Sequence, residues 1–154
     1  MTPEQFKDLI KPVTDAIAGH AVDQALEDRL NAAYPAGSEA FEAIEAACHD
    51  GIAAGWMCAE GEGDRRFGRV FEPAEDTHDL SVDVVDITDF AGPHHSHPTG
   101  EVLMVMPQDA DARFCGRGRG WVVCGPGTGH RPAVKGGRAV VLYLLPQGRI
   151  EWSE

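Results

Sequence analysis

The sequence has few basic residues and no long apolar run. Its 154 residues include 13 lysines and arginines against 25 aspartates and glutamates, which gives a formal net charge of −12. Because nucleic-acid binding needs a basic face that neutralises phosphates, this composition excludes a nucleic-acid partner. No apolar stretch approaches the ~20 residues needed to cross a bilayer, so we expect no membrane span. These absences leave small molecules as the partners to consider.

Signals for secretion and for cysteine-based sites are also missing. The first ten residues, MTPEQFKDLI, lack the basic stretch and apolar core of a signal peptide. The four cysteines, Cys48, Cys58, Cys115 and Cys124, show no Cys-x-x-Cys spacing. We therefore expect reduced thiols packed as small hydrophobic groups in a cytoplasmic protein, without a cysteine-bound structural zinc ion.

Motifs for organic cofactors are absent as well. No Gly-x-Gly-x-x-Gly follows a strand pattern, and there is no phosphate-binding loop. The glycine-rich stretch GRGRGWVVCG lies between two strand patterns, where we interpret its glycines as a turn. The sequence therefore predicts no organic cofactor.

Residues 1–55 have helical periodicity and predict three α-helices. In the first helix, a Thr-Pro start signal precedes apolar residues at helical spacing, namely Phe6, Leu9, Ile10, Val13 and Ile17. Pro12 is expected to bend or interrupt this helix near Lys11, because proline removes one backbone hydrogen bond and its ring clashes with the preceding turn.

The other two helices have clear boundaries in the sequence. The second is expected from Asp23 to about Tyr34, where Pro35 and Gly37 follow. Ser38 is expected to cap the third, and Gly55 should end it in a left-handed conformation. The three helices form an N-terminal preface.

From residue 56 onward the pattern changes to short β segments separated by Gly, Pro and Asp turns. The strand patterns are WMCAE, RRFGRVF, LSVDVVDI, EVLMVMP, ARFC, GWVVCG, RAVVLYLLP and RIEW. This many short strands in about 100 residues predict an antiparallel sandwich or barrel. Since no repeat or low-complexity linker interrupts the chain, we expect one domain over residues 1–154, with a helical preface over 1–55 and a β-barrel over 56–154.

Three histidines and a glutamate lie together in the stretch GPHHSHPTGE. In a strand, residues two apart share a face with Cα atoms about 6.6 Å apart, so His95 and His97 can reach one ion. His94 faces the other way if the strand is regular. Pro98–Gly100 suits a tight turn, and we expect the strand that Glu101 opens to fold back beside the histidine strand.

His130 is the fourth candidate ligand. It ends the stretch GPGTGH, which we expect to be a loop after the strand GWVVC, and only the fold can bring it to the other histidines. Three imidazoles and one carboxylate make a mixed nitrogen–oxygen site suited to Fe(II), Mn, Co, Ni or Zn. We predict that His95, His97, Glu101 and His130 bind a divalent metal ion, with His94 as the alternative to His95.

Both histidine stretches resemble the motifs of the cupin superfamily. His95, His97 and Glu101 fit the first cupin motif, in which His-x-His precedes a glutamate by a few residues. Pro126–His130 resembles the second motif, a Pro/Gly loop that follows a strand and ends in histidine. The resemblance implies a mainly β fold, a cupin-like antiparallel jelly-roll barrel that holds a metal ion.

Over nearly its whole length the sequence further resembles the small cupin-like 4-hydroxylaminobenzoate lyases. The resemblance is carried by the helical preface, GPHHSHPTGE, ARFCGRGRGWVVCGPGTGHRP and AVVLYLLPQGRIEW. It implies an ammonia-releasing carbon–nitrogen lyase, often a homodimer, that converts 4-hydroxylaminobenzoate to 3,4-dihydroxybenzoate (protocatechuate) in nitrobenzoate degradation. The alternatives are a cupin Fe(II) dioxygenase acting on a small aromatic acid, and a non-catalytic barrel that binds a small molecule.

A small aromatic carboxylate substrate needs a cation and groups that transfer protons. Arg131 is the first choice for the carboxylate, because a guanidinium can hold a planar carboxylate through two hydrogen bonds. Arg69 is a second candidate, and Trp121 offers an aromatic wall. His94 and Tyr143 are the candidate catalytic acid–base groups.

Overall fold

The structure, a computed structural model that describes residues 1–152, begins with three helices. They are α1 (Pro3–Ile17), α2 (Gln24–Ala33) and α3 (Glu39–Ala54). Thr2, Asp23 and Ser38 cap their N-termini, each with a side-chain oxygen that accepts the backbone N–H three residues later. Gly55 ends α3 at φ 90°, so the predicted left-handed stop is confirmed. None of the helices in this part of the chain is long and apolar enough to cross a membrane.

Pro12 lies inside α1 without interrupting it, so of the two predicted effects, a bend or an interruption near Lys11, the interruption is wrong. Pro12 and Asp8 both face solvent, while Phe6 and Ile10 are buried on the opposite face. The backbone carbonyl of Asp8 loses its helical donor, but at an exposed surface water can replace that bond. Burial of the apolar face of α1 therefore outweighs the cost of the proline, and the helix continues past it.

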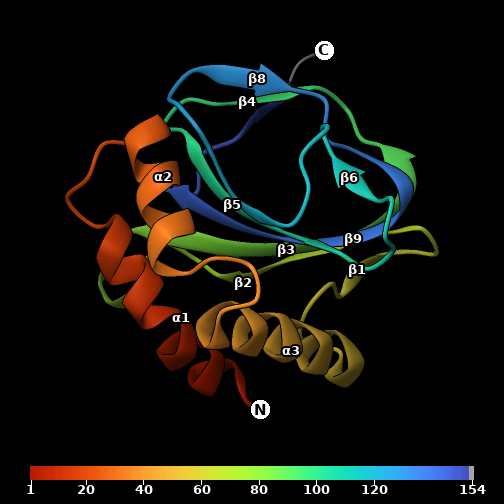
Figure 1. The fold of residues 1–154 in the computed structure, drawn as a ribbon, viewed down its shortest axis with the longest axis horizontal. Helices are drawn as coiled ribbons and strands as arrows, with labels where there is room; N and C mark the ends of the chain where they lie inside the picture. Colours follow the sequence, from red (N-terminus) through yellow and green to blue (C-terminus); the bar gives the residue numbers. More distant parts are fainter. Residues whose placement is uncertain (153–154) are drawn as a thin grey trace.

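Strands form two antiparallel sheets in the described part of the chain (Figure 1). The larger sheet has the order β1-β2-β3-β9-β5-β7, with β6 paired to β9, and the smaller has the order β10-β4-β8. The strands are β1 Glu60–Glu62, β2 Arg65–Phe71, β3 Leu80–Ala91, β4 His95–His97, β5 Glu101–Pro107, β6 Arg113–Phe114, β7 Gly120–Cys124, β8 Thr128–His130, β9 Ala133–Pro146 and β10 Glu151–Trp152.

The predicted fold class, mainly β with a cupin-like jelly roll behind a helical preface, is confirmed, but the barrel is not closed by strand pairing. Among the residues described, β4, β8 and β10 pair only with one another. In Figure 1, β4 and β8 lie opposite the central strands β3 and β9. The prediction that β5 folds back beside β4 is wrong, because the turn before Glu101 carries the chain from the smaller sheet to the larger one.

Two other local predictions are wrong. The pattern WMCAE predicts a strand, but residues 56–59 form an irregular turn. Met57 and Cys58 are apolar there because they are buried in the core next to the helices, not because they belong to a sheet. The segment that ends in His130 was expected to be a loop, but Thr128–His130 form β8, which pairs with β4.

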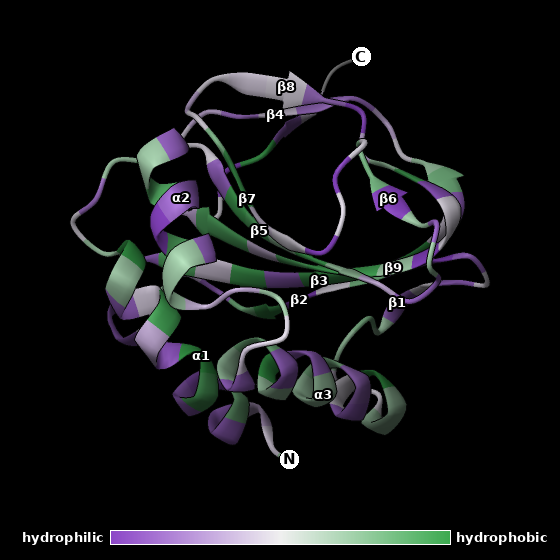
Figure 2. Cartoon of the chain, in the orientation of Figure 1, coloured by the Kyte–Doolittle hydropathy of each residue, from purple (hydrophilic) through white to green (hydrophobic). Residues whose placement is uncertain are grey.

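The larger sheet separates two apolar clusters. On one face, Leu80, Val82 and Val84 of β3 pack against the helices, as their alternation predicts. On the other face, Tyr143 and Leu145 of β9 belong to a second cluster, inside the jelly roll. Figure 2 shows hydrophobic residues concentrated along the central strands, whereas β8 is mostly pale or hydrophilic. Both faces of the larger sheet are therefore apolar.

Glu27 joins α2 to β7 and the loop before it. One carboxylate oxygen accepts the backbone N–H of Val123 at 2.9 Å, and the other accepts bonds from Gln24 at 2.8 Å and Arg117 at 3.1 Å. Burial alone would raise the pKa of Glu27, but these hydrogen bonds outweigh it and hold the pKa below its ordinary value. Ionised Glu27 thus stabilises the packing of the preface on the sheet.

We expect Glu27→Gln to lower the free energy of unfolding at pH 7 by about 1–3 kcal/mol, the range for losing charged hydrogen bonds at a buried site. Because the pKa of Glu27 is lower in the folded state, its contribution is present above the unfolded pKa and is lost as pH falls through the folded pKa. Urea denaturation at pH 7 and in acid measures both effects. Glu42→Gln, on the exposed side of α3, should change stability by less than about 0.5 kcal/mol.

Candidate metal centre

Pairing within the smaller sheet and a carboxylate from the larger one bring four side chains together. His95 of β4 lies directly opposite His130 of β8, and His97 shares its face of β4. Glu101, the first residue of β5, enters from the larger sheet. The ligand atoms of these four residues all lie within 4.8 Å of one another. His94 is not among them, so the structure selects His95 as the member of the cluster.

The cluster is tight and almost completely buried. His95, His97 and Glu101 are at most 4% exposed. The Nε2 atom of His130 lies 3.1 Å from Nε2 of His95 and 3.3 Å from Oε1 of Glu101. The Nε2 atom of His97 lies 2.5 Å from Oε2 of Glu101. Three imidazole nitrogens and a carboxylate therefore surround a common point.

Several of these atoms have no hydrogen-bond partner within residues 1–152. Nε2 of His97 and both carboxylate oxygens of Glu101 are buried and unsatisfied. The close contact between His97 and Glu101 does not count as a hydrogen bond, so both atoms still lack a partner. Buried polar atoms normally have partners, and a cation at the common point would satisfy these lone pairs. The four residues therefore fit a divalent ion.

The surroundings of His95 and His130 favour the neutral imidazole, the form that a metal requires. Burial, followed by the neighbouring His97 and His130, lowers the pKa of His95 to about 4 against the opposing effect of Glu101. Burial also lowers the pKa of His130, against the opposing effect of Glu101. Because a metal binds the neutral imidazole, these rings can coordinate at neutral pH.

Two thiols lie beside the cluster. Cys124 lies opposite Glu101 in the β5–β7 pairing, and burial followed by the charge of Glu101 raises its pKa to about 12. Burial also raises the pKa of Cys115, whose Sγ lies 4.0 Å from Nδ1 of His130. Both cysteines are free thiols, and neither belongs to the group of ligand atoms that lie within 4.8 Å of one another.

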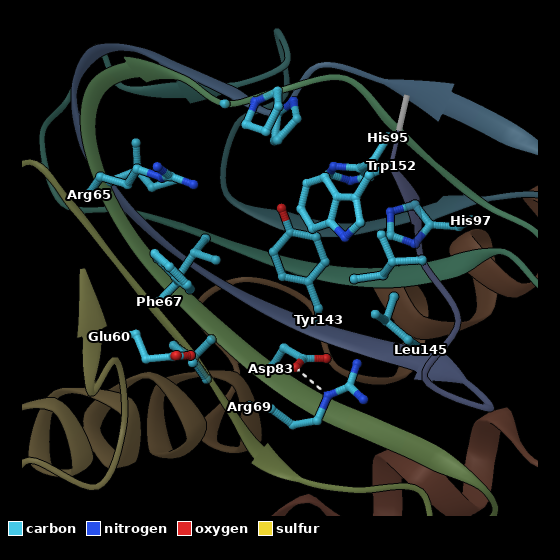
Figure 3. A pocket seen from close by; sticks show the side chains of 18 of the residues that line it. Glu60, Arg65, Phe67, Arg69, Asp83, His95, His97, Tyr143, Leu145 and Trp152 are labelled. Carbon is cyan, nitrogen blue, oxygen red and sulfur yellow. Dashed lines mark hydrogen bonds and ion pairs between the residues drawn. The ribbon is translucent and has the colours of Figure 1, made fainter. Parts of the chain in front are cut away.

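A cavity of about 320 Å³, which we call the pocket, lies between the histidines and the inner face of β2, β3 and β9 (Figure 3). His95 and His97 line one part of it. Figure 3 shows the Tyr143 hydroxyl directed into the pocket. Trp152 of β10 lies edge-on to His95, with ring centroids 5.0 Å apart, and forms another part of the wall. The pocket therefore gives a small molecule access to the cluster.

Two of the predicted site residues line the pocket, the catalytic candidate Tyr143 and the substrate-binding candidate Arg69. Burial raises the pKa of Tyr143 well above its ordinary value, so its hydroxyl stays protonated. Arg69 is already engaged: its guanidinium donates to Asp83 at 2.8 Å, to Glu72 at 3.2 Å and to the carbonyl of Gly148 at 3.1 Å. The charge of Arg69 is thus neutralised by the protein's own carboxylates.

The other predicted residues lie elsewhere. Trp121 packs against Phe41 on the helix side of the sheet and donates its indole N–H to the carbonyl of Tyr34, so the expected aromatic wall at this position is corrected. Arg131 is exposed and does not line the pocket. His94 is exposed outside the pocket, with its ring against Gly129, and its acid–base role stays a prediction that this position does not favour.

Sequence reasoning missed Arg65, Phe67 and Trp152, which all line the pocket. The signal for the first two was present, since alternation along RRFGRVF places Arg65, Phe67 and Arg69 on one face of β2. No local signal pointed to Trp152, because only the pairing of β10 with β4 brings it next to His95.

Comparison with known proteins gives a family match along nearly the whole chain. The profile of a family described as PnbB, 4-hydroxylaminobenzoate lyase, matches residues 8–152. A 4-hydroxylaminobenzoate lyase of Nocardioides sp. (strain LMS-CY) is 34% identical over 161 residues, covering 99% of this chain and 95% of that protein. One from Pseudomonas putida is 34% identical over 146 residues, covering 83% of this chain and 82% of that protein.

Solved structures resemble the chain only distantly. A protein of unknown function with a cupin-like fold from Ralstonia eutropha JMP134 has a TM-score of 0.40 at 11% identity, covering 58% of this chain and 60% of that one. A cupin-like protein from Thermotoga maritima MSB8 has a TM-score of 0.35 at 19% identity, covering 63% of this chain and 85% of that one. Neither similarity bears on the reaction.

Proposed function

The chain belongs to the 4-hydroxylaminobenzoate lyase family, and we propose that it is a metal-dependent lyase converting 4-hydroxylaminobenzoate to 3,4-dihydroxybenzoate and ammonia. The observation that carries the proposal is the 34% identity to a lyase of that name over 99% of the chain. The pocket of about 320 Å³ is large enough for one substituted benzene ring beside the histidine cluster. This activity places the enzyme in the breakdown of nitroaromatic acids.

The overall reaction adds one water and releases one ammonia. The nitrogen–oxygen bond breaks, the ring carbon that carried nitrogen gains an oxygen, and a neighbouring carbon carries the second hydroxyl of the product. Atoms and electrons balance without an external oxidant or reductant, so the reaction itself requires no organic redox cofactor. The demands on the protein are therefore to hold charge, orient the ring and move protons.

His95, His97, Glu101 and His130 would hold the divalent ion, which would supply Lewis acidity toward the hydroxylamino oxygen and water. The protonated hydroxyl of Tyr143 points into the same pocket and can hold or deliver a proton at its oxygen. Burial of the cluster excludes bulk water, which strengthens every electrostatic interaction made there. The donor set suits Fe, Mn, Co, Ni or Zn.

We expect the metal-replete protein to release ammonia and 3,4-dihydroxybenzoate in equal amounts from 4-hydroxylaminobenzoate under strict anaerobiosis. Protein reconstituted separately with each of the five metals, with metal content measured, identifies the active ion. A dioxygenase would need oxygen for turnover, and a binding protein would release no product. No ammonia above the protein-free control with any of the metals would rule the lyase out.

We also propose a cytoplasmic location, a homodimer and a single domain. The free cysteines support a reducing compartment such as the cytoplasm. The apolar cluster that joins all three helices to β3, β5, β7 and β9 supports one domain over residues 1–154. The homodimer stays a proposal that rests on the family resemblance, because a single exposed tryptophan such as Trp152 is an ordinary surface feature. Sedimentation analysis of the full chain measures the assembly.

A further inference from the structure

We propose that Arg65 binds the carboxylate of the aromatic substrate and so directs its para substituent toward the histidine cluster. The inference rests on the proposed function, which supplies a benzoate as the substrate, but the residue is identified by the pocket alone. Arg65 is the first residue of β2, and it lines the pocket together with His95 and His97. In Figure 3 it lies on one side of Tyr143, while His97 and Trp152 lie on the other.

Two aromatic rings position the Arg65 side chain. Its guanidinium carbon lies 5.1 Å from the ring centroid of Phe67 and 5.4 Å from that of Phe90. Cation–π contacts of this kind hold the guanidinium plane through attraction that does not cancel its charge. The N–H groups at the edge of the plane remain available to a planar anion, which a guanidinium binds with two parallel hydrogen bonds.

Arg65 is also the pocket arginine whose charge is not neutralised. Within residues 1–152, no carboxylate lies at ion-pair distance from Arg65, whereas Arg69 is paired with both Asp83 and Glu72. In the β1–β2 pairing Glu62 lies opposite Arg65 and Glu60 lies opposite Phe67, but neither carboxylate forms an ion pair with Arg65, and of the two only Glu60 lines the pocket. The pocket therefore contains one guanidinium with binding capacity left for a ligand.

The surrounding charge makes such a local cation necessary. The chain has a formal net charge of −12, so the field of the whole protein repels a benzoate anion. Physiological salt screens distant charges beyond about 8 Å, so an arginine in direct contact outweighs that field. With the carboxylate at Arg65 and the ring alongside Phe67 and Tyr143, the substituent at ring position 4 points toward His95 and His97. The pocket should thus favour para-substituted benzoates.

Two non-reacting probes of the same shape test this inference without turnover. Calorimetry on metal-replete protein compares 4-hydroxybenzoate, which carries the charge, with neutral 4-hydroxybenzamide. We expect wild-type protein to prefer the acid, and Arg65→Met to weaken acid binding by about 10- to 100-fold, the range for a hydrogen bond to a charged group. Amide affinity should change by less than about threefold, and Arg65→Lys should recover part of the preference.

Arg66→Met is the matched control, because Arg66 is adjacent on β2 and does not line the pocket. It should leave the acid preference intact. Equal acid affinity in Arg65→Met and wild type, an equal loss of acid and amide binding, or a wild-type protein without acid preference would each overturn the assignment. Ammonia release by the wild type is measured separately, so failure of the Arg65 assignment leaves a working lyase, and failure of the lyase leaves the binding result interpretable.

Discussion

Glu101→Ala is expected to lose stoichiometric metal and, with it, ammonia release, while the chain stays folded. Glu101 is the anionic member of the cluster, and its carboxylate is 1% exposed. Without it, three neutral imidazoles would have to hold a divalent charge in a buried site with no compensating anion. Removing a mere neighbour of a metal ligand costs about 10- to 100-fold in affinity, so loss of the ligand itself should cost more than about 100-fold.

Elemental analysis after dialysis and the rate of ammonia release check this result, with circular dichroism to verify the fold. Added metal should raise the melting temperature of the wild type, since about 2.7 kcal/mol of stabilisation accompanies a hundredfold excess over Kd, and should not raise that of Glu101→Ala. Glu42→Ala is the control, because that carboxylate is exposed on α3 and does not belong to the cluster. One equivalent of tightly bound metal in Glu101→Ala would show that the histidines suffice.

Tyr143→Phe is expected to lower kcat by about 10²- to 10⁴-fold, the usual contribution of a positioned acid–base group. The hydroxyl is directed into the pocket, and burial keeps its pKa well above the ordinary value, so it stays protonated and can donate a hydrogen bond to charge that develops on the substrate. Phenylalanine preserves the ring and its edge-on contact with Phe114, whose centroid lies 6.2 Å away. The change therefore removes the hydroxyl group and leaves the ring in place.

Steady-state kinetics, metal content and 4-hydroxybenzoate affinity together check the role of Tyr143. Metal content should stay at the wild-type level, and the probe should bind within about threefold of wild type, because the aromatic wall is intact. Tyr34→Phe is the matched control, since that hydroxyl bonds the carbonyl of Pro12 among the helices. A wild-type kcat in Tyr143→Phe would remove Tyr143 from the reaction and leave proton transfer to another group.

Local rules account for the parts of the fold that the sequence predicted well. The caps at Thr2, Asp23 and Ser38 and the stop at Gly55 depend only on backbone groups a few residues away, so the sequence contains the whole interaction. Pro12 shows where local rules fail: the energy of an apolar face buried in the core beside the other helices is tertiary, and it exceeded the local cost of the proline.

Trp121 shows a second kind of failure. Alternation predicts that it shares a face with Val123, but it does not say which face of the sheet looks into the pocket. Both faces of the larger sheet are apolar, because one packs on the helices and the other lines the jelly roll. Alternation alone therefore could not tell which face of the sheet Trp121 lies on. Its contact with Phe41 shows that it lies on the face covered by the helices.

The sequence by itself determined the helices, the strand-rich remainder and the shared face of His95 and His97, because each follows from geometry within a few residues. The place of Glu101 beside them depends on the turn that carries the chain into the larger sheet. Only the tertiary structure placed His130 opposite His95, since that contact depends on pairing across more than thirty residues. It also decided which arginine can meet a ligand: the β2–β3 register sets Arg69 opposite Asp83 and Arg65 opposite Ile87. Register is fixed by packing across the sheet, which no single strand encodes.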